Sequence, residues 1–489
     1  MSDASTPPAH PELAELLGDR YTESAFERSF YRRDLAVVPP FLASLVGDTL
    51  PAAVARPRTA EEVSTIVRYA VECRLPLTPR AAATTAYWNA VPMRGGLVLD
   101  LNGMRGLVSL DEATLQATVL PGTRWEELDR ALRRRGVALL SYPTSAPAAT
   151  VGGWISMEGH GIGSLKHGGV AEQVTGLEVV LADGRIADVT GTSQVPVTWS
   201  AKRFAGSEGT LGIITRVELT VRRQPAATGQ HLLVFPDMVA LQGAAATLSG
   251  ATPRPFYAHF AAPAYGQFLR RAGFEPPGDG PAADGPLLAL TYDGDASEVA
   301  AGAERVCQEA KRWDGSALPA EAAVREWDER FFALRLKRAG PSVLGAESWL
   351  PLDQLAAYEA GVAALGARQG LLMATYGTVV APGLATVMSL YPCDETRTLP
   401  YILALSLTKK LTDIAFRHGG RPYGTGVWNT PYLSRAELVE RHGHKARMDP
   451  MNLLNPGKAQ RPPPLLWPPT FKMGMDVLAG LRRAGMGAL

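Results

Sequence analysis

The stretch ATVGGWIS at residues 149–156 decides the fold, together with GSEGTLGIIT at residues 206–215. Each stretch places glycines beside short apolar runs, as in turns that follow strands. Glycine is favoured where the backbone approaches a ligand closely, because it has no Cβ and accepts positive φ angles. The two stretches therefore predict strands and helices whose Gly-rich turns surround a bound molecule.

Short strands alternate with helices around these turns. Thr59 and Glu62 form a capping-box pattern before one predicted helix, and Thr123 and Glu126 repeat the pattern before another. Apolar runs bounded by turn residues predict strands at residues 53–55, 95–101, 115–120 and 177–181.

A second domain is predicted from about Gln224. Two strand–helix pairs, residues 231–235 with 239–248 and 287–292 with 296–310, flank a Gly/Pro-rich loop at residues 273–285. This pattern predicts an α/β domain with an antiparallel sheet.

Four segments in order carry a family resemblance: PRAAATT (79–85), PTS with ATVGGWIS (143–156), GSEGTLGIIT (206–215) and DPMNLLNPGK (449–458). The chain resembles the vanillyl-alcohol oxidase/p-cresol methylhydroxylase superfamily of FAD proteins, and within it the D-lactate/glycolate dehydrogenase branch. The resemblance implies an α+β fold, with an FAD-binding domain at residues 1–223, a substrate or cap domain at residues 224–423, and a C-terminal segment at residues 424–489 that returns to the FAD domain.

The resemblance also implies which residues hold the cofactor. These are Pro79, Arg80, Ala81, Ala82, Ala83, Thr84, Thr85, Ala90, Val91, Pro143, Thr144, Ser145, Thr150, Val151, Gly152, Gly153, Ser156, Gly159, Gly161, Gly163, Ser164, Glu208, Gly209, Gly212, Ile213, Ile214, Asn455 and Lys458.

The first of these segments departs from the family pattern. Relatives usually have P-R-G-G-G-T-S, with backbone N–H groups lining the FAD pyrophosphate. The alanines at 81–83 imply either a loop without positive φ angles or a slightly displaced pyrophosphate. Relatives with a histidyl–flavin bond carry His where this chain has Thr84, so the resemblance implies non-covalent FAD.

The metal-ligand motifs of the hydroxy acid dehydrogenases are absent. The corresponding segments here are GTVVAPGLA (377–385) and YGTGVWN (423–429), which keep none of the family's ligands. A metal site needs at least three donor groups, and His442 with His444 supplies two. No catalytic metal is expected.

Without a metal, an arginine is the expected partner of a substrate carboxylate. Arg330, in a segment that resembles the family's W-x-x-R, is the first candidate, ahead of Arg335 and Lys337. His160 is the preferred base over His167, Tyr376 and Tyr423. Tyr423 and Asn429 are expected in a metal-free substrate wall. A helix-surface arginine and a histidine bonded to backbone remain open alternatives.

Bulk properties bound the function. The chain has 489 residues and a net charge of +1, which favours neither nucleic acid nor an anionic membrane as a partner. Three widely spaced cysteines indicate buried, reduced thiols, and no apolar run is long enough to span a bilayer. The expected protein is cytoplasmic, or peripheral to a membrane.

The resemblance implies an FAD-dependent oxidoreductase that dehydrogenates a 2-hydroxy acid or small alcohol and passes electrons to a quinone or iron–sulfur partner. Two alternatives stay open: a flavoenzyme for a larger metabolite, and an FAD-holding subunit of an electron-transfer complex.

Overall fold

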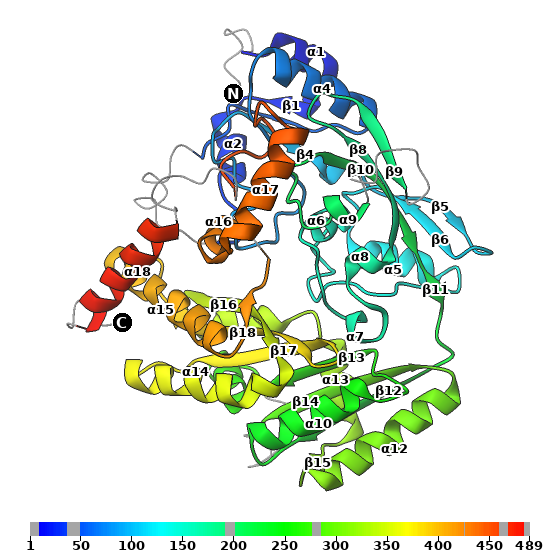
Figure 1. Ribbon diagram of the computed structural model, residues 1–489. Coiled ribbons are helices and arrows are strands. Elements are labelled where there is room, and N and C mark those ends of the chain that lie inside the picture. Colours follow the sequence, from blue (N-terminus) through cyan, green and yellow to red (C-terminus); the bar gives the residue numbers. More distant parts are fainter. Residues whose placement is uncertain are drawn as a thin grey trace.

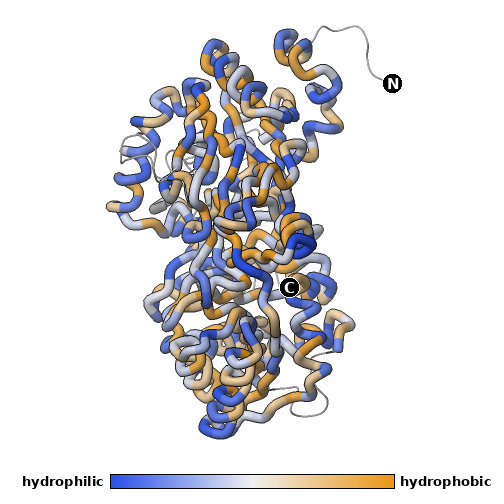
Figure 2. The backbone as a smooth tube through the Cα atoms, turned by 90° about the vertical axis from the view of Figure 1, so that its right-hand side faces the viewer, coloured by the Kyte–Doolittle hydropathy of each residue, from blue (hydrophilic) through white to orange (hydrophobic). Residues whose placement is uncertain are grey.

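The computed structural model describes residues 9–36, 49–190, 201–275, 285–424, 426–458 and 468–483. Two lobes are stacked along the long axis of the molecule, and the C-terminal helices lie along one side (Figures 1 and 2). The N-terminal lobe holds the sheets formed before residue 224, and the cap lobe holds one large sheet formed after it.

The N-terminal lobe contains two main sheets. The first has the strand order β1-β2-β4-β3, with β1 at Tyr21–Thr22, β2 at Ala53–Ala55, β4 at Leu97–Asp100 and β3 at Leu77–Arg80. The second has the order β5-β6-β10-β8-β9, with β5 at Leu107–Asp111, β6 at Gln116–Val119, β10 at Ile213–Thr220, β8 at Val174–Val180 and β9 at Ile186–Thr190. Strands β2, β3 and β4 are parallel, and the second sheet is antiparallel.

Short elements complete this lobe. They are α1 (Pro11–Leu17), α2 (Ala25–Tyr31), α4 (Ala60–Glu72), α5 (Trp125–Arg133), α6 (Val151–Ser156), α7 (Ser164–His167), α8 (Val170–Gln173), α9 (Ala201–Phe204) and the two-stranded sheet of β7 (Val137–Ala138) with β11 (Arg222–Arg223).

Helix α4 joins the two sheets. Its buried residues Val63, Ile66 and Val67 share one apolar cluster with strands of both sheets. The Thr59 hydroxyl accepts a hydrogen bond from the Glu62 amide, as the sequence pattern predicts. The second predicted cap is wrong: α5 begins at Trp125 without a side-chain cap, because the Thr123 hydroxyl donates to the Leu120 carbonyl instead.

The cap lobe is built on an eight-stranded sheet whose pairings are antiparallel. Its order is β15-β12-β14-β13-β17-β18-β16-β19, with β15 at Ser316–Ala317, β12 at Ala227–Val234, β14 at Leu287–Gly294, β13 at Tyr257–Ala261, β17 at Ala374–Ala381, β18 at Leu384–Cys393, β16 at Ser342–Pro351 and β19 at Arg421–Pro422. This sheet confirms the antiparallel α/β cap predicted from the sequence.

Helices cover both faces of the cap sheet. One face packs against α10 (Met238–Gly250), α12 (Ala296–Arg312), α14 (Leu355–Gln369) and α15 (Thr398–Arg417). The other face packs in part against α11 (Pro263–Arg271) and α13 (Ala320–Asp328). The loop predicted between β13 and β14 lies mostly outside the described residues.

The last segment contacts both lobes. It contains α16 (Gly426–Asn429), α17 (Arg435–Met448) and α18 (Pro468–Arg483). After α17, Leu454 forms a parallel bridge with Leu77, which brings this part back to the first sheet. Helix α18 instead packs beside α15 of the cap, where Asp476 lies 3.1 Å from the Lys409 ammonium.

The three cysteines are free. The sequence predicts that all three are buried, but this is correct only for Cys393. Cys73 and Cys307 are exposed: Cys73 lies just after the end of α4, and Cys307 lies on α12.

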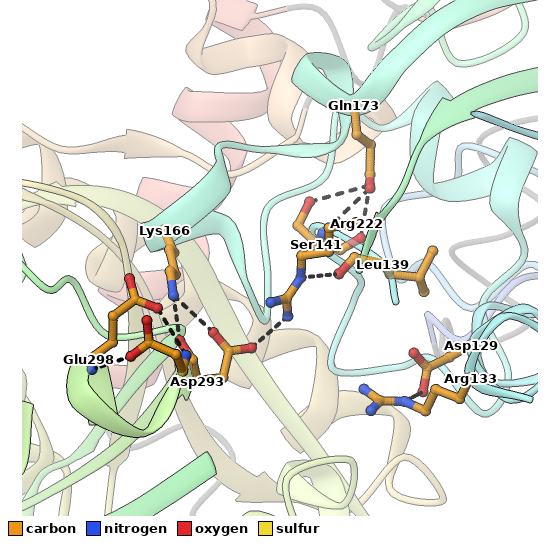
Figure 3. A network of polar contacts seen from close by, with 10 residues as sticks. Asp129, Arg133, Leu139, Ser141, Lys166, Gln173, Arg222, Asp293 and Glu298 are labelled. Carbon is orange, nitrogen blue, oxygen red and sulfur yellow. Dashed lines mark hydrogen bonds and ion pairs between the residues drawn. The ribbon is translucent and has the colours of Figure 1, made fainter. Parts of the chain in front are cut away.

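A buried ion network fastens the two lobes together (Figure 3). Asp293 on β14 of the cap has a side chain that is 3% exposed, and its Oδ2 lies 2.5 Å from Arg222 Nη2. Its Oδ1 lies 3.2 Å from Lys166 Nζ on α7. Arg222 also donates to the Leu139 carbonyl at 3.0 Å, so the network links α7, β11 and β14.

Candidate functional site

A cavity of about 710 Å³ lies between the two lobes. At one end its wall is formed by the Gly-rich turns of the N-terminal lobe, and at the other by the cap sheet and the segment after α13. A volume of this size is in the range of cofactor and ligand sites.

Most of the residues predicted to hold the cofactor line this cavity. They are Pro79, Arg80, Ala81, Ala82, Ala83, Thr84, Thr85, Ala90, Pro143, Thr144, Ser145, Thr150, Gly152, Gly153, Ser156, Gly161, Glu208, Gly209, Gly212, Ile213 and Ile214. Segments distant in sequence are thus brought to one surface. That these residues touch FAD stays a prediction.

The first loop has the properties of an anion cradle. Among the described residues, the backbone amides of Ala82, Ala83 and Thr84 have no recorded acceptor, and all three residues line the cavity. The Arg80 guanidinium holds the base of the loop by donating to the carbonyls of Arg33 at 2.8 Å and Ala90 at 3.2 Å. Free amides on a concave loop suit the pyrophosphate of a dinucleotide.

Ala83 has a φ of 50°, so the expectation of a loop without positive φ angles is wrong. The chain keeps at this position a left-handed backbone conformation that favours glycine, although the residue is alanine.

The other turns need glycine for space. A Cβ on Gly209 would lie 2.5 Å from the Pro79 ring, and one on Gly161 would lie 2.6 Å from the Tyr142 carbonyl. The turn at Gly209 therefore packs against Pro79 of the first loop, and the turn at Gly161 packs against the backbone of Tyr142. The open amides and tight turns together fit a flavin dinucleotide laid along this wall.

Seven predicted cofactor residues do not line the cavity: Val91, Val151, Gly159, Gly163, Ser164, Asn455 and Lys458. Lys458 is fully buried, and its ammonium donates to the carbonyls of Trp88 at 2.5 Å and Val91 at 2.6 Å. The Asn455 amide donates to the carbonyls of Asn89 and Glu208. The two side chains hold the loops that form the wall.

His160 lines the cavity, but its ring is held by backbone. Its Nδ1 donates to the Glu158 carbonyl at 3.2 Å, and its ring lies edge-on to Trp349 at 4.7 Å. Burial lowers the pKa of the imidazole. His167, the second histidine considered, does not line the cavity, and burial lowers its pKa to about 4.

Tyr423 and Asn429 line the cavity where the metal motif of relatives is missing. The Tyr423 hydroxyl accepts a hydrogen bond from the His160 amide at 2.8 Å, and burial raises its pKa far above its usual range. The Asn429 amide donates to the carbonyls of Tyr423 and Gly424. Both side chains shape the wall and are already bonded to backbone.

Arg330 lines the cap end of the cavity. Its guanidinium carbon lies 4.1 Å from the ring centre of Trp327 and 4.2 Å from that of Phe331. One nitrogen donates to the Trp327 carbonyl at 2.7 Å, while the buried Nε has no partner within the described residues. Arg335 also lines the cavity, but it is paired with Glu329.

The sequence reasoning missed several polar residues of the cap end. These are Glu347 on β16, Tyr257 and His259 on β13, Glu326 on α13 and Thr378 on β17, all lining the cavity. The signal available for Glu347 was a single acidic residue within an otherwise uncharged strand, SVLGAESWLP. Tyr87 also lines the cavity, whereas the neighbouring Trp88 is buried in a core cluster.

The described ranges contain no cluster of three or more His, Cys, Asp or Glu side chains placed to hold a metal ion. His444 contacts Arg203 at 2.5 Å, and His442 is exposed. Nor does any described helix combine the length and apolar character required to cross a membrane.

Comparison with known proteins gives two domain matches. The FAD binding domain family matches residues 51–190, and the C-terminal domain family of FAD linked oxidases matches residues 227–459.

Two curated relatives are similar in sequence. The glycolate oxidase subunit GlcD of Bacillus subtilis is 28% identical over 84% of this chain and 89% of its own length. A D-lactate dehydrogenase of Archaeoglobus fulgidus is 35% identical over 40% of this chain and 44% of its own length.

Two solved structures share the fold. p-Cresol methylhydroxylase has a TM-score of 0.77 at 18% identity, covering 92% of this chain and 95% of its own. Alkyldihydroxyacetonephosphate synthase has a TM-score of 0.73 at 19% identity, covering 92% and 86%. Residues of both domain matches line the one cavity, and this chain is an FAD-dependent oxidoreductase of the FAD-linked oxidase family, with the fold of p-cresol methylhydroxylase.

Proposed function

We propose that this enzyme dehydrogenates a 2-hydroxy acid, or a similar small alcohol, with dissociable FAD, and passes the electrons to a quinone or a protein acceptor. The bound flavin supplies the hydride acceptor for such a reaction. The sequence similarity to GlcD over most of both chains supports this substrate class.

The observation that carries the proposal is Arg330. It lines the cavity, its guanidinium lies close to the rings of Trp327 and Phe331, and it forms no ion pair with a carboxylate of the described residues. A guanidinium fixed in this way offers a carboxylate charge-assisted hydrogen bonds and loses little side-chain freedom on binding. The chain has Thr84 at the position of the histidyl link in covalent relatives, which supports dissociable FAD.

A second candidate is a larger substrate with an apolar part. Beyond the flavin loops the cavity continues to an apolar group of side chains: Leu405, Trp428, Phe471 and Met475. A third candidate is an FAD-holding subunit that works with partner chains. It is supported by the Bacillus relative, which is named as a subunit of glycolate oxidase.

Anaerobic absorbance spectra test these alternatives. D- and L-2-hydroxy acids of increasing chain length are added to the FAD-loaded protein, and bleaching of the flavin band is recorded. The proposal predicts bleaching by one enantiomer. Bleaching only by long-chain acids would favour the second candidate, and no bleaching by any acid would contradict dehydrogenation of this substrate class.

Arg330→Met provides the matched test of the carboxylate site. We expect the acid concentration for half-maximal bleaching to rise about 10- to 100-fold, the effect of losing one charge-assisted interaction. Arg338→Met, which removes an exposed arginine outside the cavity wall, is the control and should leave that concentration unchanged.

A further inference from the structure

Glu347 is an acidic side chain in the wall of the cavity. It lies on β16, where it alternates with Ser348 and Leu350, which are buried in the sheet. Its neighbour on the same face, Trp349, packs edge-on against the ring of His160. Strand alternation therefore directs Glu347 to the side of the cap sheet that faces the N-terminal lobe.

The contacts of Glu347 leave part of its carboxyl group available. Its Oε2 accepts a hydrogen bond from the Tyr87 hydroxyl at 2.7 Å. No hydrogen bond of its Oε1 and no ion pair to a lysine or arginine is recorded in the described ranges. Burial raises the pKa of this carboxyl group to about 7, and the Tyr87 hydrogen bond opposes that rise.

The other ionisable groups at this end of the cavity are poorer proton acceptors. His160 donates from Nδ1 to the Glu158 carbonyl and keeps a lone pair on Nε2, but burial lowers the pKa of its ring, which makes it a weaker base. The Tyr376 hydroxyl donates to the Met388 sulfur at 3.0 Å, and burial raises its pKa far above its usual range. The Glu347 carboxylate accepts a proton on Oε1 while the hydrogen bond from Tyr87 to its Oε2 stays in place.

We propose that Glu347 is the group that removes the hydroxyl proton from the substrate, with Tyr87 as the residue that positions its carboxylate. The inference rests on the proposed function and deepens it, since it assigns the proton acceptor of the same reaction.

The step balances as follows. The substrate O–H bond breaks and its proton forms a bond to Glu347 Oε1. The hydrogen on the adjacent carbon leaves with both electrons as hydride, for which bound FAD would be the oxidant, and the C–O single bond becomes a carbonyl. The proton on Glu347 returns to solvent, and the two electrons would pass to the external acceptor of the proposed function.

Three tyrosines face Glu347, and burial together with its charge raises their pKa values: Tyr87, Tyr376 on β17 and Tyr423 after β19. All three have raised pKa values and stay neutral near pH 7, so Glu347 is the group expected to titrate there. The rate of flavin reduction should rise with pH and level off once Glu347 is ionised, near pH 7.

Stopped-flow reduction of the FAD-loaded enzyme tests the role directly. Glu347→Gln should slow flavin reduction by at least about 100-fold and abolish its rise with pH, with little change in the acid concentration for half-maximal rate. Glu359→Gln is the matched control, because Glu359 is a second buried glutamate with a pKa raised to about 7 but lies outside the cavity wall. It should leave the rate unchanged.

Infrared titration without substrate gives a reading independent of turnover. In the wild-type protein the infrared band of protonated carboxyl groups should decrease as the pH rises through neutrality. The decrease should be smaller in Glu347→Gln and in Glu359→Gln, because each variant has one titrating carboxyl group fewer. Tyr87→Phe, which keeps the carboxyl group, should move the Glu347 transition and the midpoint of the pH–rate profile to higher pH together.

The outcomes separate the two proposals. The role of Glu347 is overturned, while the proposed function stands, by either of two results. One is that flavin reduction in Glu347→Gln is as fast as in the wild type. The other is that this variant loses as much of the protonated-carboxyl band near neutral pH as the wild type does. If no 2-hydroxy acid bleaches the wild-type flavin, the proposed function is overturned, and the role of Glu347 in that reaction falls with it.

Discussion

Ala83 shows how a single residue carries strain in the loop at residues 79–85. A non-glycine residue in the left-handed region is disfavoured by roughly 1–2 kcal/mol, and glycine loses part of that advantage through its greater freedom in the unfolded chain. We therefore expect Ala83→Gly to raise the free energy of unfolding by about 0.5–1 kcal/mol, as measured by urea denaturation.

Ala82→Gly is the matched control in the same loop. Ala82 has no positive φ, so glycine adds only unfolded-state freedom there and should lower the free energy of unfolding by about 0.4–1 kcal/mol. Equal losses in the two variants would show that Ala83 is not strained.

At the scale of elements, α14 carries a buried carboxyl group that makes the free energy of unfolding depend on pH. Glu359 is 6% exposed, its Oε2 has no partner among the described residues, and burial raises its pKa from 4.5 to about 7. The folded protein thus holds this proton more tightly than the unfolded chain does. The contribution of Glu359 to stability falls as pH rises from about 4.5 to 7, and then stays constant.

Glu359→Gln removes that loss. Relative to wild type, the variant should be about equally stable at pH 4.5 and more stable at pH 8 by up to about 3 kcal/mol, as measured by urea denaturation at both pH values. The exposed Glu304→Gln on α12 should show no such difference. A Glu359→Gln variant that gains nothing at pH 8 would mean that water or a partner stabilises the charge.

The part of the cavity wall that comes from the N-terminal lobe could be predicted from the sequence because each of its segments is continuous in the chain. A Gly-rich turn keeps its signature within about ten residues, so residues 79–85 and 149–156 could be assigned to one surface. Glu347 could not be assigned to the site in this way. Its position depends on the register of β16 in the cap sheet and on how the cap faces Tyr87, which is 260 residues away.

Local patterns also failed where another partner competed. Thr123 and Glu126 have the spacing of a capping box, but the loop before α5 offers the Thr123 hydroxyl the Leu120 carbonyl at 2.7 Å. The alanines at 81–83 suggested a loop without positive φ, whereas Ala83 has a φ of 50°. In the first case a carbonyl three residues earlier takes the hydroxyl that the cap would use, and in the second an alanine adopts a conformation that favours glycine.

At the scale of the whole molecule, the cavity exists because two lobes are held at a fixed distance. Its walls come from both lobes, so any loosening of their junction changes the size and shape of the cavity. Asp293 is the centre of that junction, because its buried carboxylate forms ion pairs with both Lys166 and Arg222 of the other lobe (Figure 3).

Asp293→Asn keeps the shape of this residue and leaves two partly buried cations without their counter-charge. Breaking one side of a buried ion pair costs roughly 3–5 kcal/mol, and the partial exposure of Arg222 and Lys166 places our expectation at about 3 kcal/mol. Thermal release of FAD, followed by flavin fluorescence, should therefore occur at a lower temperature. Asp183→Asn, which breaks an exposed pair with Arg185, should change it little.

The same junction can be tested in the opposite direction. When all members of a buried ion network are replaced together by apolar side chains of similar volume, the stability of the protein often stays unchanged or increases. The reason is that no charge is left without its partner. The triple variant Lys166→Met, Arg222→Met and Asp293→Leu should therefore release FAD at a higher temperature than Asp293→Asn. If the triple variant is no better, the Arg222 bond to the Leu139 carbonyl and its stacking on Phe256 at 4.7 Å, rather than the charges, hold the lobes in place.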